Sequence, residues 1–230
     1  MARRTEYSES QAAGRLRVPI TAFRWARHTG LVPAPDTETQ QWSRAAVEAM
    51  DADAIRAALP QEPISGGVAA DRIAVAIGTP NPTACGEKMN VTAFVVRRFV
   101  DRGLLVDLSA NPESSLHHPG QVAEVCRHEN LADMVAADAP LGPEQAAARL
   151  NLRRADIDHM VRLGWLRSPQ SIEVRFGTSR AGAVDVPLYT TASVDAVVPA
   201  HPEVDWDQLR AVGKGRRSPL ASLRPTPATT

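Results

Sequence analysis

The chain has 230 residues, of which 43% are hydrophobic and 4% aromatic, and its formal net charge is zero. This length provides for two domains of ordinary size or three small ones. The sequence has no apolar run of about 18 residues, no segment that resembles a secretory signal, and only two cysteines, Cys85 and Cys126. We therefore expect no membrane partner, no disulfide framework and a cytoplasmic location.

The zero net charge conceals an uneven distribution along the chain. Residues 1–60 carry +1, residues 61–140 carry −4 and residues 141–230 carry +3. Affinity for phosphate depends on the local density of cations rather than on the total charge. Both ends of the chain can therefore bind nucleic acid, whereas the acidic middle is better suited to a protein partner.

The first unit, residues 1–60, predicts three helices joined by short connections. The helices are expected at residues 10–16, 19–29 and 43–59. Ser8 or Ser10 is a suitable N-cap for the first helix, and Pro19 is favoured in the first turn of the second. Residues 31–42 leave room for a short β-hairpin wing between the second and third helices.

One spacing occurs twice in the chain. A glutamine and two alanines precede a leucine, and a glycine follows that leucine by fourteen residues. The two copies are Gln11-Ala12-Ala13 with Leu16 and Gly30, and Gln145-Ala146-Ala147 with Leu150 and Gly164. Small alanines let two short helices pack closely, and a glycine with positive φ ends the second helix. The spacing predicts a helix-turn-helix in each copy.

The middle unit allows two registers of the same pattern. In the register that we prefer, Met89 lies fourteen residues before Gly103, and residues 67–77 form an extra leading helix. The two alanine positions are then held by Cys85 and Gly86. In the alternative register, residues 63–73 align with residues 140–150, and the proline-rich stretch that follows is an insertion.

The third unit contains the clearest hairpin signal. Apolar and polar residues alternate on both sides of residues 177–182, which predicts strands at residues 172–176 and 184–189. Closing helices are expected at residues 121–137 of the middle unit and from residue 190 of the third. The final residues are basic and rich in proline, and beyond a short helix at residues 205–212 we expect them to be disordered.

These features predict a mainly α-helical protein with short β-hairpin wings, built from tandem winged helix-turn-helix units. The units are residues 1–60, the acidic residues 61–139 and residues 140–199, followed by the tail of residues 200–230.

The order of residues in the first unit resembles the MerR and excisionase type of winged helix-turn-helix. The segments that carry the resemblance are Gln11-Ala12-Ala13, Arg24-Trp25-Ala26, Gly30-Leu31-Val32-Pro33, and Trp42 ahead of Ala46-Val47-Glu48. The first half of the third unit shares it. The resemblance implies that the second helix enters the major groove of DNA and that the wing contacts the backbone or the minor groove.

The outward residues of the second helices are the candidate DNA contacts, because arginine binds guanine with two hydrogen bonds and also grips phosphate. In the first unit the candidates are Arg15, Arg17, Thr21, Arg24, Arg27 and His28. In the third they are Arg153, Arg154, Asp158 and Arg162, with Arg175 and Arg180 in the wing. Since the middle unit is acidic, we expect its Arg97 and Arg98 to contribute less.

The expected function is sequence-specific binding of double-stranded DNA, as a transcriptional regulator or an excisionase-like accessory factor of the nucleoid. The sequence has no glycine-rich phosphate loop and no nucleophile motif, so we expect no catalysis and no cofactor. Cys126-Arg127-His128 lacks the ligand spacing of structural zinc, so no metal is expected. The alternative is a protein-interaction module that docks on a polymerase, recombinase or partition protein through residues 61–139.

Overall fold

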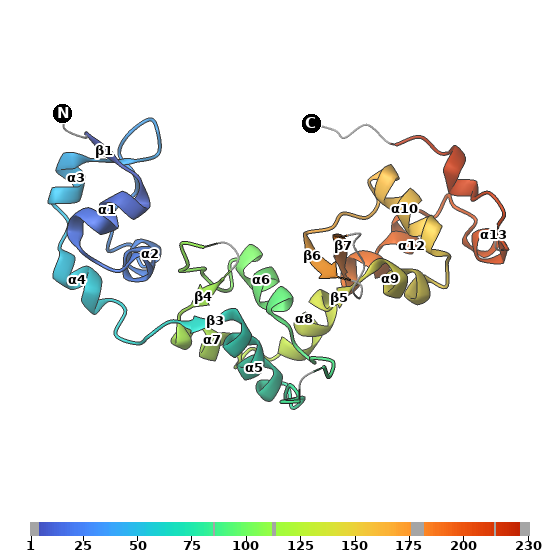
Figure 1. Ribbon diagram of the computed structural model, residues 1–230, viewed down its shortest axis with the longest axis horizontal. Coiled ribbons are helices and arrows are strands. Elements are labelled where there is room, and N and C mark those ends of the chain that lie inside the picture. The colour runs from blue at the N-terminus through green and yellow to red at the C-terminus, as the bar shows by residue number, and fades with distance from the viewer. Residues whose placement is uncertain (1–4, 85, 112–113, 176–181, 214, 226–230) are drawn as a thin grey trace. The chain divides into compact units, whose positions relative to one another are not determined.

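The computed structural model describes residues 5–84, 86–111, 114–175, 182–213 and 215–225 (Figure 1). About half of the chain is helical, and its sheets are small and antiparallel. The chain divides into two compact units, residues 1–132 and residues 133–230. Among the described residues, no helix is long and apolar enough to cross a membrane.

The order of elements repeats three times along the chain (Figure 1). Each repeat has a short strand, two helices, a strand that pairs with the first one, and two further helices. Repeat 1 consists of β1 (Glu6–Tyr7), α1 (Glu9–Leu16), α2 (Ile20–His28), β2 (Trp42–Ser43), α3 (Arg44–Glu48) and α4 (Ala52–Ala57). Repeat 2 consists of β3 (Ile64–Ser65), α5 (Gly66–Ala76), α6 (Ala93–Asp101), β4 (Leu116–His117), α7 (Pro119–Val125) and α8 (Leu131–Asp138).

Repeat 3 extends this order with a hairpin and a C-terminal segment. It consists of β5 (Pro140–Leu141), α9 (Pro143–Leu150), α10 (Arg154–Leu163), β6 (Gln170–Arg175), β7 (Ala183–Thr190), α11 (Thr191–Asp195) and α12 (Val197–Ala200). It is followed by α13 (Trp206–Ala211) and the 3-10 helix η1 (Pro219–Ser222). In its three-stranded sheet, β7 lies between β5 and β6.

A buried pair of alanines lies in the first helix of every repeat. The pairs are Ala12 and Ala13, Ala69 and Ala70, and Ala146 and Ala147, and none of these residues is more than 4% exposed. Because alanine has a single methyl group, the second helix packs closely against the first in each repeat. The second helices fill the cores with larger side chains, among them the fully buried Phe23, Phe99, Ile157 and Met160.

A glycine in left-handed conformation follows the second helix of each repeat. Gly30, Gly103 and Gly164 have φ angles of 80°, 74° and 80°. The chain reverses there in the same way each time, as the amides of Leu31, Leu104 and Trp165 donate to carbonyls of Ala26, Phe99 and Met160. The next residue, Val32, Leu105 or Leu166, then enters the core. The positive φ predicted for Gly30 and Gly164 is confirmed.

A side chain at position 164 should therefore destabilise the C-terminal unit. Gly164→Val places a β-branched residue in the left-handed region, at a cost of roughly 1–2 kcal/mol. We expect a melting temperature several degrees below that of the wild type, measured by circular dichroism.

Gly14→Ala is the matched control for that substitution. Gly14 lies within α1 with open space around its Cα, so the added methyl group should stabilise the helix slightly. Gly182, before β7, also has a positive φ of 81°, so a side chain added there would be strained as well and Gly182→Ala is not a neutral control. Equal melting temperatures for Gly164→Val and the wild type would contradict the capping role.

The wing predicted at residues 31–42 of repeat 1 is wrong. Residues 31–41 contain no strand, and Trp42–Ser43 pairs with Glu6–Tyr7 instead. Pro33 and Pro35 lack the amide hydrogens that a hairpin ladder requires. The loop is closed by Asp36, which accepts hydrogen bonds of 2.6 Å from both the amide and the hydroxyl of Ser43.

The long closing helices predicted for the first two repeats are each broken into two. In repeat 1 the break falls before Asp51, whose carboxylate caps α4 by accepting from the amides of Asp53 and Ala54. In repeat 2 the break lies at residues 126–130, where the amide of Asn130 donates to His128. Local capping by polar side chains competes with the continuation of the helix at both places.

The preferred register of the middle unit is also wrong, and the alternative is correct. The helix that pairs with α6 is α5, which begins directly after β3, as α9 begins directly after β5. The connection between α5 and α6 is an insertion held by Asn81, which donates to Asp71 and accepts from the amides of Asn90 and Val91. Gly86 lies in this connection, and Cys85 lies outside the described residues.

His117 is buried in repeat 2 at a position where the other repeats have large aromatic residues. It pairs with Ile64, as Trp42 pairs with Tyr7 and Tyr189 pairs with Leu141. Its Nδ1 lies 3.1 Å from the carbonyl of Val106, and its Nε2 is buried with no hydrogen-bond partner in the described part of the chain. Burial lowers the pKa of His117 below its ordinary value of 6.5.

This burial predicts a pH-dependent stability for the compact unit of residues 1–132. Below about pH 6.5 the unfolded chain protonates His117 while the folded chain does not, so stability falls as the pH drops. His117→Phe should weaken this dependence, as judged by melting temperatures at pH 7.5 and 5.5. The neighbouring His118 also titrates with a lowered pKa but is present in both proteins. Parallel pH dependences for the two proteins would show that His117 is not the responsible group.

Candidate nucleic-acid interface

Helix α10 presents its apolar side to the core and its charged side outward, as the sequence predicted. Ile157 and Met160 are fully buried, and Leu152 packs against the same core cluster. Arg154 lies at the first position of the helix, forms a salt bridge with Asp158 and lies 3.8 Å from Glu144. The charged side therefore begins with an arginine whose side chain is partly exposed.

Arg153 precedes α10 and is paired with a buried carboxylate. Its Nε and Nη2 each donate a 3.0 Å hydrogen bond to Asp156, which has no exposed surface. Burial alone raises the pKa of Asp156, but hydrogen bonds from Arg153 and Ser218 outweigh that effect and hold it below its ordinary value. The carboxylate is therefore charged at neutral pH, and Arg153 is the cation that compensates it.

A C-terminal strap, defined here as residues 215–223, lies along α10. Arg153 Nη1 donates to the carbonyls of Gly213 and Arg216, at 3.2 and 2.8 Å. Further along the helix, Arg162 donates to the carbonyls of Leu220 and Leu223, at 2.8 and 3.0 Å. Leu220 is 1% exposed and belongs to the core of the unit. The disorder predicted for this part of the tail is therefore wrong, because a buried leucine and two arginines anchor it.

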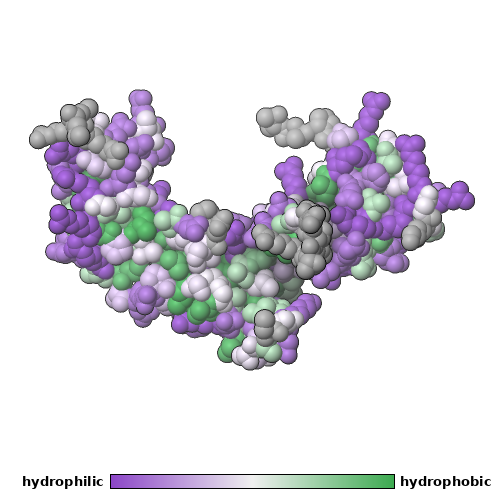
Figure 2. All heavy atoms as spheres, viewed as in Figure 1, coloured by the Kyte–Doolittle hydropathy of each residue, from purple (hydrophilic) through white to green (hydrophobic). Residues whose placement is uncertain are grey.

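The strap and the start of α10 enclose an open basic pocket of about 790 Å³. The pocket is lined by Arg153, Arg154, Ala155, Val212, Gly215, Arg216 and Arg217. Four of these residues are arginines, and none is acidic. Figure 2 shows that long hydrophilic side chains project from this end of the chain. The pocket has the composition of an anion-binding surface.

The ion pair makes Arg153 a structural residue, which can be tested by unfolding. Arg153→Ala leaves the buried Asp156 without its partner and should lower the free energy of unfolding by about 3 kcal/mol. Urea denaturation at pH 7 measures this loss. Arg154→Ala is the matched control, because the Arg154–Asp158 pair is exposed and contributes little.

The loss caused by Arg153→Ala should shrink in acid. A carboxylate with a lowered pKa contributes stability above its unfolded pKa of about 3.9 and loses it as the pH falls through the folded value. The wild type and Arg153→Ala should therefore converge in stability below about pH 4. A constant difference between pH 7 and pH 3 would show that the ion pair is not its origin.

The hairpin of repeat 3 agrees closely with its prediction. Strands β6 and β7 pair along their length, with Ile172 opposite Val186 and Val174 opposite Val184. Arg175 is the last residue of β6 and pairs with Ala183, and its side chain is outside the described part. Arg180 lies outside the described residues altogether.

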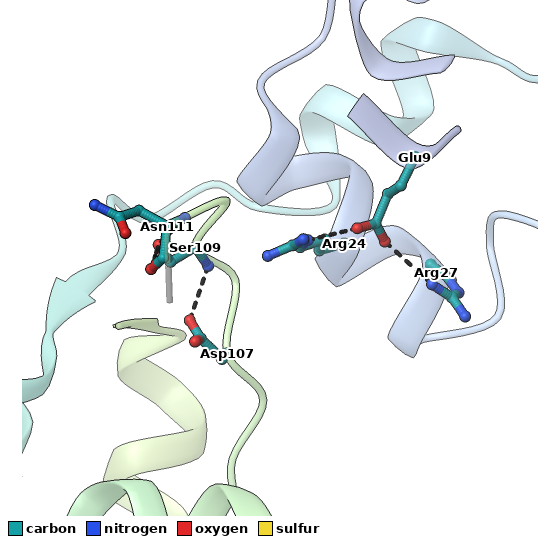
Figure 3. A network of polar contacts seen from close by, with 6 residues as sticks. All are labelled: Glu9, Arg24, Arg27, Asp107, Ser109 and Asn111. Carbon is teal, nitrogen blue, oxygen red and sulfur yellow. Dashed lines mark hydrogen bonds and ion pairs between the residues drawn. The ribbon is translucent and has the colours of Figure 1, made fainter. Parts of the chain in front are cut away.

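In repeat 1, α1 supplies a carboxylate to the arginines of α2. Glu9 accepts from Arg24 Nε at 2.7 Å and from Arg27 Nη1 at 3.1 Å, as Figure 3 shows. Arg15 pairs with Glu48 at 3.0 Å, and Arg17 ends α1 in the left-handed conformation. A pocket of about 380 Å³ beside α2 is lined by both signs of charge: Glu9, Arg24, Arg27, His28, Val106 and Asp107.

The outer face of α2 also contacts repeat 2 of the same compact unit. The ring of Trp25 stacks on that of His118 with centroids 4.1 Å apart, and His28 Nε2 lies 3.4 Å from Gln121 Nε2. Thr21 is half-buried on another side of the helix, where it lines a pocket of about 280 Å³. The predicted contacts of repeat 1 are thus brought together on α2, but neighbouring protein groups occupy much of that face.

The structure adds residues that the sequence did not single out as a site. Asp156, Ser218 and Leu220 hold the strap, and Arg216 and Arg217 line the basic pocket. The only signal in the sequence was the cationic run at residues 214–217.

The described residues contain no group of three or more side chains placed to hold a metal ion. In repeat 2, Arg98 pairs with Asp101 at 2.6 Å.

Comparison of the chain with protein-family models, with curated proteins and with solved structures finds no match.

Proposed function

We propose that the protein binds double-stranded DNA and that its three repeats are helix-turn-helix units related to the MerR and excisionase type, of which the third carries a β-hairpin wing. Support comes from the repeated order of elements, from the buried alanine pairs and from the glycine that follows each second helix. The observation that carries the proposal is the basic pocket at the start of α10, where Arg154, Arg216 and Arg217 lie beside the structural Arg153. Its cellular role would be transcriptional regulation or assistance to a recombinase, in association with the nucleoid.

In this proposal α10 is the recognition helix of the C-terminal unit. Helix-turn-helix proteins contact base edges with the first residues of their second helix. Arg154 has that position. Its side chain can leave the exposed ion pair with Asp158 and bind a guanine or a phosphate of DNA. Arg153 and Arg162 instead form hydrogen bonds within the protein, to Asp156 and to the carbonyl of Leu220, so neither is a proposed DNA contact.

The hairpin β6–β7 acts as the wing, and Arg175 is the last residue of β6. Arg180, the second wing arginine proposed from the sequence, lies outside the described residues. Wings of this kind contact the phosphate backbone or an adjacent minor groove. The α2 helix of repeat 1 contributes less to binding, because Glu9 binds both Arg24 and Arg27 and compensates one of their two charges, and His118 stacks on Trp25.

The proposal predicts a strong dependence of DNA affinity on salt. If Arg154, Arg216, Arg217 and one wing arginine provide about four phosphate contacts, the logarithm of the association constant should fall with log salt at a slope of about −3.6. Affinity for a genomic duplex library should then drop by roughly 100-fold between 50 and 200 mM salt. Fluorescence anisotropy with the full chain measures this slope. Absence of binding at 50 mM salt would refute the proposed function.

A second function, docking on a protein through repeat 2, has one specific observation in its favour. Val68 and Val75 are 44% and 64% exposed, and their spacing of seven residues places them on one face of α5. Replacing both valines by serine should leave DNA affinity unchanged if DNA binding is the main function. If the wild type captures a protein partner in the absence of DNA and the double serine variant does not, docking through repeat 2 would be favoured instead.

A further inference from the structure

We infer that the C-terminal strap forms part of the DNA-contacting surface, in which Arg216 and Arg217 bind backbone phosphates while Arg153 and Arg162 hold the strap in place. This inference rests on the proposed function and adds a binding segment to it. The ligand is the phosphate backbone of a duplex, contacted without regard to base sequence. The exposed Arg216 and Arg217 of the tail thereby have the role that the sequence predicted for Arg153 and Arg162.

The hydrogen bonds of Arg153 and Arg162 exclude them from that role. A guanidinium has five N–H donors, and Arg153 makes four hydrogen bonds, two to Asp156 and two to backbone carbonyls. Turning toward a phosphate would leave the buried Asp156 uncompensated. Arg162 likewise donates hydrogen bonds from both of its terminal nitrogens to carbonyls of the strap, those of Leu223 and Leu220. Both residues therefore act as positioning residues.

The strap is anchored on the C-terminal side of its two arginines as well. Ser218 is buried and caps η1 by accepting from the amide of Leu220, and Leu220 lies in the core. On the other side, Gly215 turns the chain at a φ of 79°, and the amide of Arg216 donates to Gly213. Arg216 and Arg217 are thus held between fixed points, which reduces the entropy lost when they bind.

The side chains of Arg216 and Arg217 are exposed and available. Among the described residues neither forms an ion pair, whereas the arginines of α2 share Glu9. Both line the pocket that also contains Arg154, the first residue of α10. A phosphate of DNA bound by Arg154 would therefore have neighbouring phosphates within reach of the strap, since phosphates follow closely along each strand.

The test compares Arg216→Ala/Arg217→Ala with Arg167→Ala/Arg224→Ala in the full chain. Both variants remove two positive charges from exposed positions of the C-terminal unit, but only the first removes them from the pocket. We expect the first variant to reduce the salt slope by about 1.8 and to weaken binding equally on unrelated duplexes. The control should change the slope by much less, and both variants should melt at the wild-type temperature.

Several outcomes would overturn the inference. Equal slopes for the two double variants, with the wild type still binding DNA, would refute the role of the strap and leave the proposed function intact. A wild type that binds no DNA would refute the proposed function itself. Calorimetry with inorganic pyrophosphate distinguishes a free anion from DNA as the ligand of the strap. If Arg216→Ala/Arg217→Ala loses pyrophosphate binding but keeps the wild-type affinity for DNA, the assignment to the DNA backbone is overturned.

Discussion

The close approach of two helices over a pair of alanines is the constraint on which each repeat depends. Because the buried alanines of the first helix are small, the second helix comes near enough to bury Phe23, Phe99 or Ile157. A glycine with positive φ then reverses the chain so that the next apolar residue also enters the core. Larger side chains at the alanine positions would separate the helices and leave the core unfilled.

The three repeats share this constraint and differ in what covers their second helices. Helix α2 is engaged by Glu9 of its own repeat and by His118 of the next. Helix α10 is instead crossed by the strap, which neutralises no arginine and brings two more. The same local fold therefore presents a largely occupied face in repeat 1 and a basic pocket in repeat 3.

The Arg153–Asp156 pair connects the fold of the C-terminal unit to its proposed function. A buried carboxylate requires a fixed cation, and the cation it holds in turn binds the strap through carbonyls. The structural Arg153 and the proposed DNA contact Arg154 are thus different residues that lie side by side in the sequence. Mutational data on this helix should be read with that distinction, because loss of Arg153 acts through stability.

Much of the local structure was determined by the sequence alone. Helices α1, α2 and α10, the β6–β7 hairpin and the glycine turns follow from short-range spacing, capping and backbone preference, which act within a few residues. Three features did not follow from the sequence, because they depend on pairing and capping that compete with an equally periodic pattern. They are the pairing of Glu6–Tyr7 with Trp42–Ser43, the register of repeat 2, and the helix breaks before Asp51 and at residues 126–130. The sequence predicts the arginines at and before α10 as charged outward residues, but only the tertiary structure shows that Arg153 and Arg162 hold the strap whereas Arg154 forms exposed ion pairs. This distinction rests on the burial of Asp156 and Leu220, which brings together residues about 60 positions apart and leaves no trace in local periodicity.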